Sequence, residues 1–357
     1  MTPYSRQNIN QDDINAVLRV LRSDYLTTGP DVEIFEQALA DKVGALGAVA
    51  VGNGTQALHL ALLAAGIGPG MSVIVPTITF VATANAVRMC GAEVAFADVD
   101  PITGLMQEPH ALAAAARAQS PVRAIIPVHM GGFAANMARL SDLGWTVIED
   151  ACHALGAKDV GACSWSHSTV FSFHPVKSIT TGEGGAVVSQ DPVALDRMRR
   201  LRAHGLKRAL DGGYDQCELG YNYRIDDMSA ALGRSQLNRL DDFIAERRRI
   251  FYRYWSNLPA ILPGFGAHRG SAVHLVRLHL EDAVQRDRVR YALTTAGYGT
   301  QLHYRPVHTQ PYYVSRYKNL YLPGAAAYYA QTLSIPCYPG LDLADVDRIC
   351  DVIESAL

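Results

Sequence analysis

The feature that most constrains the fold is an alternation of short apolar runs with longer helical patterns. The runs occupy residues 48–51, 73–75, 94–97, 124–128, 147–148, 170–173 and 186–188. Runs this short and this apolar are typical of strands that are buried on both faces. Helical patterns such as 57–65 and 111–118 lie between them. We therefore predict an α/β fold with a mainly parallel sheet covered by helices, in which ligands bind at the carboxyl ends of the strands.

Amphipathic helices are predicted before this region. Ile14, Val17, Leu18 and Leu21 repeat at helical spacing, and residues 32–43 show the same pattern.

The pattern of apolar and polar residues changes after a long, charged helical stretch at about 229–255. Residues 276–280 alternate apolar and polar side chains, as in a strand with one solvated face, and 346–353 predict a closing helix. With 357 residues the chain is long enough for two domains. We predict a large domain over 1–240 and a smaller C-terminal α/β domain over 241–357.

Composition argues against several classes of protein. Lys and Arg together number 32 and Asp and Glu 34, so no overall positive charge favours nucleic acid or an anionic membrane. The six cysteines show neither C-x-x-C nor zinc-ligand spacing, which favours reduced thiols and no metal site. The first residues lack a signal-peptide pattern, and no apolar run reaches about 18 residues. We expect a cytoplasmic protein.

The segment 51–58 combines a strand end, a glycine-bearing turn and a helix start. Helix amino termini carry unpaired N–H groups and partial positive charge, so Gly54 and Thr55 could hold a phosphate. A tight turn in which Thr55 merely caps the helix explains the same residues.

The segment 147–153 places two acids, Glu149 and Asp150, at a strand end, and His153 follows three residues after Asp150. A carboxylate there can pair with a cationic ring nitrogen or a metal, and the imidazole can donate to an oxygen. A helix cap with a buried, satisfied histidine is the alternative.

The segment 171–185 places Lys177 between apolar residues and a glycine-rich turn. Lysines usually lie on solvated faces, and desolvation lowers the pKa of an amine and suits it to Schiff-base chemistry. An ordinary surface lysine in a loop is the alternative. Binding of pyridoxal phosphate (PLP) requires a site for its phosphate, an acid that pairs with its pyridinium nitrogen and a lysine that reacts with its aldehyde. The three segments together supply these groups.

The chain resembles the DegT/StrS-type nucleotide-sugar aminotransferases over nearly its whole length. The resemblance rests on residues 25–30, 52–58, 76–86, 149–150, 171–185, 221–224 and 303–306. It implies the PLP-dependent transferase fold of type I, which is like that of aspartate aminotransferase.

The resemblance also implies roles for single residues. Lys177 matches the Schiff-base lysine that also moves the substrate proton, and Asp150 matches the acid that keeps the pyridine nitrogen protonated. His153 stands where most of the family has glutamine and is expected near the ring hydroxyl. Phe80 matches the aromatic residue stacked on the ring.

Further matches concern the phosphate and the substrate. Gly54, Thr55 and Ser172 match phosphate-binding positions. Asn222 matches a residue that reaches the phosphate from a neighbouring subunit, which implies a homodimer with shared active sites. The candidates for sugar-nucleotide contacts are Tyr4, Thr28 and Tyr304.

The implied reaction is a ping-pong transfer of an amino group from glutamate to a 4-keto nucleotide sugar. The residues 172–181 around Lys177, together with His153, favour one substrate. It is UDP-2-acetamido-2,6-dideoxy-β-L-arabino-hexos-4-ulose, an intermediate of pseudaminic acid biosynthesis. Another 4-keto nucleotide sugar such as a perosamine precursor, a cyclitol, and a catalytically degenerate sugar-binding regulator remain alternatives. Lys177 argues against the related sugar 3-dehydratases, which have histidine at this position.

Overall fold

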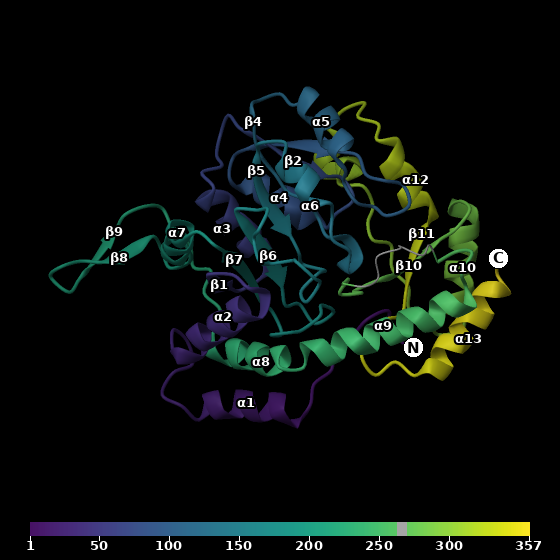
Figure 1. Cartoon of the computed structure of the whole chain (residues 1–357), viewed down its shortest axis with the longest axis horizontal. Helices are drawn as coiled ribbons and strands as arrows, with labels where there is room; N and C mark the ends of the chain where they lie inside the picture. Colours follow the sequence, from purple (N-terminus) through teal and green to yellow (C-terminus); the bar gives the residue numbers. More distant parts are fainter. Residues whose placement is uncertain (263–269) are drawn as a thin grey trace.

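A computed structural model of the chain describes residues 1–262 and 270–357, and a seven-stranded sheet forms its centre (Figure 1). The strands are β1 (Gly47–Val51), β2 (Ser72–Pro76), β3 (Glu93–Ala97), β4 (Val122–Ile125), β5 (Thr146–Asp150), β6 (Ser168–Ser172) and β7 (Gly185–Ser189). Their order is β1-β7-β6-β5-β4-β2-β3. Each of the seven predicted apolar runs overlaps one strand of this sheet, although β4 ends at Ile125 within the predicted run 124–128.

Strand directions bring several strand ends to one edge of the sheet. The pairs β2–β3, β2–β4, β4–β5 and β5–β6 are parallel, whereas β7 runs antiparallel to both β6 and β1. The prediction of a mainly parallel sheet is confirmed. Because β5 and β6 are parallel neighbours, their last residues, Asp150 and Ser172, reach the same edge.

Helices cover both faces of the sheet because neighbouring strand residues point to opposite sides. Val49 and Val51 join a core with α3 (Gly54–Ala64), α4 (Val81–Met89) and α7 (Pro192–Arg202). The other face packs against the helices α2 (Pro30–Val43), α5 (Glu108–Ala116), α6 (Met137–Ser141) and α8 (Asp227–Leu237).

The C-terminal part has an apolar core of its own, built around the antiparallel pair β10 (Val276–His279) and β11 (Thr332–Ile335). Its helices are α10 (Ala283–Thr295), α11 (Pro311–Val314), α12 (Pro323–Gln331) and α13 (Leu343–Glu354). A short 3-10 turn, η2 (Val307–Thr309), lies between α10 and α11, and another, η1 (Met130–Gly132), follows β4 of the central sheet. The exact domain boundary at residue 240 stays a prediction.

The predicted helix at 229–255 is wrong in one respect, because two helices occupy this stretch. These are α8 and α9 (Leu240–Asn257), and α9 runs from the sheet to the C-terminal part (Figure 1). The main chain leaves helical geometry at Arg239, whose ψ is 4° and whose guanidinium bonds to Asn8 and Asp13. Leu237, Leu240 and Ile244 stay at helical spacing across the break, so the apolar pattern does not reveal it.

The expected solvated face of β10 is also wrong, since Arg277 is only 3% exposed. Its Nη1 donates to the carbonyl of Thr103 and to the hydroxyl of Tyr328, each at 2.8 Å, and its guanidinium lies over the Phe133 ring. The large domain therefore covers this strand face.

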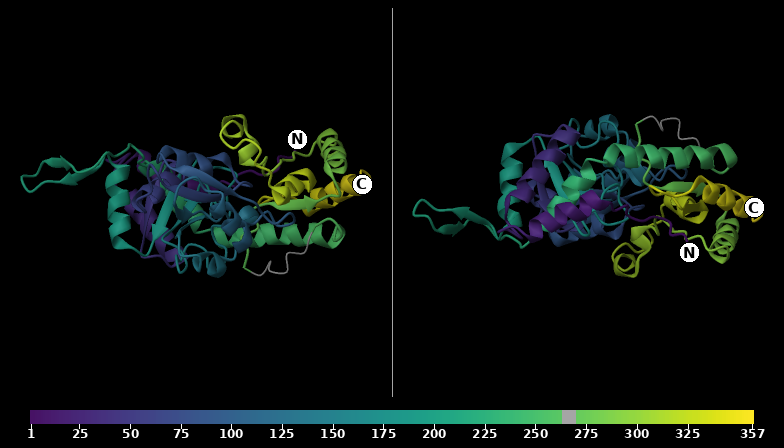
Figure 2. Two further views of the ribbon diagram at one scale, coloured as in Figure 1. Left: turned by 90° about the horizontal axis from the view of Figure 1, so that it is seen from above. Right: turned by 90° about the horizontal axis from the view of Figure 1, so that it is seen from below.

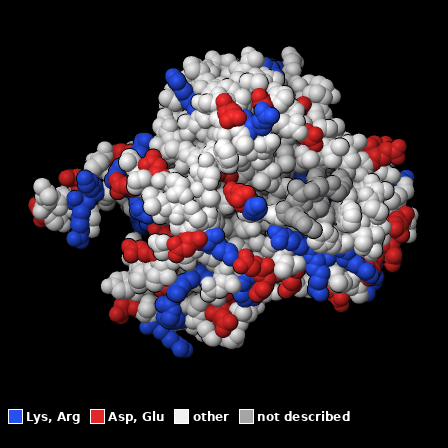
Figure 3. Space-filling view, in the orientation of Figure 1, with Lys and Arg blue, Asp and Glu red and all other residues white. Residues whose placement is uncertain are grey.

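A small hairpin, β8 (Leu206–Arg208) and β9 (Tyr214–Gln216), projects from the body of the molecule in every view (Figures 1 and 2). On the face shown in Figure 3, acidic and basic side chains are interspersed. In the described residues, no helix is both long and apolar enough to cross a membrane.

Candidate active site

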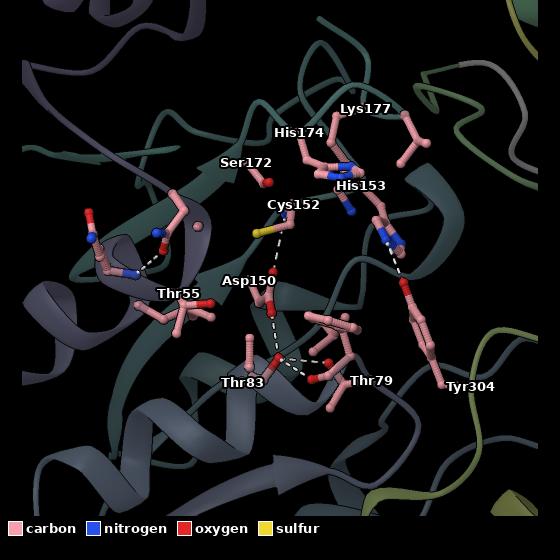
Figure 4. Close-up of a pocket in the computed structure, with 18 of the residues that line it drawn as sticks. Thr55, Thr79, Thr83, Asp150, Cys152, His153, Ser172, His174, Lys177 and Tyr304 are labelled. Carbon is pink, nitrogen blue, oxygen red and sulfur yellow. Dashed lines mark hydrogen bonds between the residues drawn. The ribbon is translucent and has the colours of Figure 1, made fainter. Parts of the chain in front are cut away.

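A cavity of about 730 Å³ opens at the edge of the sheet where β5 and β6 end (Figure 4). The predicted site residues that line it are Tyr4, Gly54, Thr55, Phe80, Asp150, His153, Ser172, Lys177 and Tyr304. The three candidate segments of the sequence thus meet in one place. Thr28 and Asn222 do not line this cavity, and both are exposed on the surface of the chain.

One end of the cavity is the amino terminus of α3. The helix is capped by Asn53, whose side chain accepts from the Gln56 N–H at 2.9 Å, so the alternative in which Thr55 merely caps the helix is wrong. The N–H groups of Gly54 and Thr55 belong to the first turn of α3, where main-chain N–H groups find no carbonyl acceptor within the helix. A side chain at position 54 would come within 3.0 Å of the Ser172 Cβ. The glycine therefore keeps open a cradle of N–H groups and hydroxyls that suits a phosphate.

Asp150 is held at the cavity floor by two donors. The Thr83 hydroxyl donates to its Oδ2 at 2.7 Å, and the Cys152 N–H donates to Oδ1 at 3.2 Å (Figure 4). No helix begins after Asp150, so the alternative that it is a helix cap is wrong. A buried carboxylate fixed in this way is suited to pair with a cationic group of a ligand.

Glu149 points to the other face of β5 and does not line the cavity. It accepts from His129 Nε2 at 2.8 Å, from Thr169 at 3.0 Å and from Ser166. Burial alone would raise the pKa of Glu149, but these hydrogen bonds lower it below the usual range. Of the two acids at this strand end, only Asp150 faces the cavity.

His153 is neutral because burial and the nearby Lys177 lower its pKa well below the usual range. Its Nδ1 accepts from the Gly131 N–H at 3.3 Å, so the proton sits on Nε2, which lies 3.1 Å from the Tyr304 hydroxyl. His153 therefore donates to Tyr304. Burial also raises the pKa of Tyr304, so its own proton is available to another acceptor.

Lys177 lies half-buried in a turn, in which its N–H donates to the His174 carbonyl at 2.8 Å. Burial lowers the pKa of its amine, although the charges of Cys152 and Asp150 act in the opposite direction. Because Lys177 is half-buried and lines the cavity, the alternative of an ordinary surface lysine is wrong. A lysine with a lowered pKa offers more unprotonated amine at neutral pH, which is the nucleophilic form.

We expect this lowered pKa to be visible in the rate at which apo-protein attaches PLP. Only the unprotonated amine attacks the aldehyde, so the rate should increase with pH and reach half its maximum below the ordinary lysine value of 10.5. Stopped-flow absorbance over a pH series measures this rate, and N-acetyl-lysine amide provides the reference for the ionisations of the aldehyde. A midpoint at or above that of the reference amine would show that Lys177 is not desolvated.

Phe80 stands at the mouth of the cavity as the residue before α4, with 57% of its surface exposed. Its ring lies 5.9 Å from that of Tyr304. A large exposed aromatic ring at a cavity wall offers a face on which a planar ligand can stack.

Three side chains of the site, those of Thr79, Thr83 and Cys152, were not among the predicted residues. Thr83 orients Asp150, and the Thr79 hydroxyl in turn bonds to Thr83 at 2.7 Å. Cys152 lines the cavity next to Asp150, and burial raises its thiol pKa. Thr83 lies in the first turn of α4 and Thr79 in the segment before its cap, Phe80, so no helical spacing in the sequence pointed to this pair.

The sequence matches the DegT/DnrJ/EryC1/StrS aminotransferase family over residues 7–354. The chain belongs to this family. It is therefore an aminotransferase, and the family resemblance stated from the sequence is confirmed.

Solved structures agree with this assignment over almost the full length of the chain. DesV of S. venezuelae, solved with a ketimine intermediate, is 34% identical, with a TM-score of 0.89 and coverage of 96% of this chain and 94% of that one. Helicobacter pylori PseC, an aminotransferase in the biosynthesis of pseudaminic acid, is 27% identical, with a TM-score of 0.91 and 99% coverage of both chains. Spr1654 of Streptococcus pneumoniae in its PMP form is 26% identical, with a TM-score of 0.93 and coverage of 100% and 99%.

These matches confirm the predicted fold of type I and, for the family, PLP as the cofactor. The residues of this chain fit the cofactor. The amino terminus of α3 suits the phosphate, Asp150 suits the pyridinium and Lys177 suits the aldehyde.

Proposed function

We propose that the enzyme transfers an amino group from L-glutamate to the 4-keto group of a nucleotide-linked 6-deoxy sugar. The substrate that we favour is UDP-2-acetamido-2,6-dideoxy-β-L-arabino-hexos-4-ulose. The observation that carries the proposal is the convergence of Lys177, Asp150 and the α3 amino terminus on one cavity. The similarity to PseC, which acts in the biosynthesis of pseudaminic acid, supports the choice of substrate.

Bound PLP supplies an aldehyde that accepts the amino group and a ring that takes up negative charge from the adjacent carbon. The protein provides the groups around it. Asp150 would keep a proton on the ring nitrogen, and the hydrogen bond from Thr83 holds the carboxylate in place for this task. Lys177 Nζ would hold the cofactor through its aldehyde in the resting enzyme and, when free, would accept and return the proton of the substrate carbon.

Three further side chains orient the reacting groups. Phe80 would offer its ring face to the cofactor ring, and Ser172 would assist the α3 amino terminus in holding the phosphate. His153 fixes the direction of the Tyr304 hydroxyl, whose free proton is then available to a sugar oxygen.

A second cavity of about 710 Å³ adjoins the first at Met89 and gives room for the nucleotide part of the substrate. Asn85, Arg88, Gln310 and Tyr312 line it. Tyr312 is largely exposed and offers a ring for stacking with a base, and Arg88 offers a guanidinium that already pairs with Glu93. A sugar nucleotide can therefore span the two cavities.

The test presents PLP-loaded enzyme and L-glutamate with a panel of UDP-, GDP- and dTDP-linked 4-keto sugars and keto-cyclitols. Mass spectrometry detects the aminated product, and 2-oxoglutarate is measured in parallel. We expect one 2-oxoglutarate per amine and the highest kcat/KM with the UDP-linked 2-acetamido sugar. Preference for a GDP-linked sugar or a cyclitol would contradict the substrate. Failure to convert any member, with no half-reaction with glutamate, would favour a regulatory protein.

The active unit proposed here is a homodimer in which each copy completes the site of the other. The segment 221–224 is extended, and Tyr221 and Tyr223 stack on each other against His59 of α3. Asn222 lies between them and is exposed, so it faces away from its own chain. From there it could reach the phosphate in a second copy.

Two apolar surfaces support self-association. The helix α1 (Gln11–Leu21) leaves its predicted apolar stripe uncovered, with Ile14, Leu18 and Leu21 exposed by 46%, 39% and 52%. The β8–β9 hairpin projects into solvent with Leu210 and Tyr214 exposed. An isolated hairpin is marginally stable in water, and an uncovered apolar stripe usually marks an interface.

Mixed dimers test the shared site. Lys177→Ala and Asn222→Asp should each be inactive alone, the second because a carboxylate beside the phosphate repels it. If Asn222 serves the neighbouring site, refolding the two together should restore about a quarter of wild-type activity, because half of the dimers then carry one intact site. Activity no higher than the average of the two variants would contradict the shared site.

A further inference from the structure

Residues 2–8, here called the strap, cross the C-terminal part of the molecule next to the active site. The Thr2 N–H donates to the Gly297 carbonyl at 2.9 Å, and the Gly299 N–H donates to the Thr2 carbonyl at 2.8 Å. Further along, the Cys337 N–H donates to the Tyr4 carbonyl at 3.0 Å. These main-chain bonds fasten the first half of the strap to the C-terminal core.

The far end of the strap is fastened to the large domain. The Asn8 carbonyl accepts from Gln236 Nε2 at 2.9 Å, and the Asn8 side-chain oxygen accepts from Arg239 Nη1 at 3.0 Å. Both donors lie at the junction of α8 and α9. The strap therefore joins the C-terminal part to the large domain.

Between these anchors the strap touches the loop that carries Lys177. Ser5 is 7% exposed, and its hydroxyl donates to the carbonyl of Val176 at 3.2 Å. Val176 directly precedes Lys177, and both residues line the cavity, as does Tyr4, the neighbour of Ser5. One hydrogen bond thus joins the strap to the main chain beside the lysine.

The strap also covers the outer side of this loop. Arg6, Asn8 and the loop residues Pro175 and Lys177 enclose a space of only about 10 Å³. Such a space has room for roughly one water molecule. The guanidinium of Arg6 lies over the Tyr338 ring at 5.0 Å, which keeps this part of the strap against the C-terminal core. The strap therefore packs closely against the back of the Lys177 loop.

We propose that Ser5 is a positioning residue for Lys177 and that the strap links the placement of the lysine loop to that of the C-terminal part. Inside the loop, the Lys177 N–H donates to the His174 carbonyl, and the Thr181 N–H and the Thr180 hydroxyl both donate to the Phe173 carbonyl. The bond from Ser5 adds a restraint from outside the loop on the residue before Lys177, and it holds the main chain so that the amine enters the cavity. The assignment rests on the proposed function only in taking Lys177 as the attachment point of PLP.

Hydrogen exchange of the apo-protein tests the restraint without the cofactor. Ser5→Ala should speed amide exchange in the segment 174–180 by about fivefold, which corresponds to the loss of a hydrogen bond of about 1 kcal/mol. Ser5→Thr keeps the hydroxyl and should exchange like the wild type. Ser141→Ala, which removes an exposed hydroxyl on α6 that bonds only locally, should leave the segment unchanged.

A second readout follows the lysine itself. In Ser5→Ala, the pH midpoint for attachment of PLP should move towards that of the reference amine, because a looser loop admits water, and Ser5→Thr should retain the wild-type midpoint. Unchanged exchange in 174–180 or a change spread evenly over the chain would overturn the proposal, as would failure of Ser5→Thr to restore the midpoint. Failure of wild-type Lys177 to attach PLP would contradict the proposed function, whereas the exchange result would still decide the role of the strap.

Discussion

Lys177→Ala should lower kcat for amino transfer by roughly 10⁴-fold, because the variant loses both the attachment point of the cofactor and the group that moves the proton. Lys177→Arg should be equally inactive, since a guanidinium stays protonated and cannot attack an aldehyde. Rapid-quench measurement of 2-oxoglutarate in a single turnover with glutamate isolates this step. Because the amine lies in a cavity wall rather than in the core, we expect both variants to fold.

Lys158→Ala is the matched control, since Lys158 is exposed and lies outside the cavity. It should turn over at the wild-type rate. If Lys177→Ala retained more than a small fraction of wild-type turnover, with unchanged cofactor content and thermal melting, another group would have to move the proton. The assignment of Lys177 would then be wrong.

Asp150→Asn should lower the rate of the glutamate half-reaction by roughly 10²- to 10⁴-fold, the range seen when one well-placed electrostatic partner is removed. The amide has nearly the same shape and keeps a partner for the Thr83 hydroxyl, but it has no charge to hold a proton on the ring nitrogen. The cofactor should remain attached to Lys177, because that bond does not involve Asp150. Stopped-flow absorbance with glutamate measures the rate.

The control for this variant is Asp24→Asn, which removes an exposed carboxylate. It should leave the rate unchanged. An Asp150→Asn enzyme that reacts with glutamate at the wild-type rate would show that the ring does not depend on this carboxylate. Asp150→Glu keeps the charge but shifts it by one methylene, so its rate should fall between those of Asn and the wild type.

Most of the large domain could be predicted because its strands are apolar on both faces and separated by helical patterns. The break at Arg239 could not, since the apolar positions of α8 and α9 remain in phase and the cause is a contact with Asn8 and Asp13 far away in the sequence. Arg277 shows the same limit. Its burial depends on Tyr328 and Phe133, which no local pattern brings next to β10.

The candidate site, too, could be predicted only in part from the sequence. Asp150, Lys177 and Gly54 stand at strand or helix ends, where the fold class already places ligands, so their convergence could be predicted. The direction of each side chain could not. Alternation along β5 sends Glu149 to His129 and Asp150 to Thr83, and the sequence shows two adjacent acids without showing which one faces the cavity. The contact of Ser5 with Val176 joins residues 171 positions apart and had no sequence signal.

A covalent bond between Lys177 Nζ and PLP in the resting enzyme is the feature on which the proposed chemistry depends most directly. Borohydride reduction of PLP-loaded enzyme, followed by protease digestion and tandem mass spectrometry, locates that bond on the sequence. We predict a single phosphopyridoxyl group on the peptide that contains Lys177, and none after prior incubation with excess glutamate. The cofactor on another lysine, or no reducible adduct at full occupancy, would contradict the account.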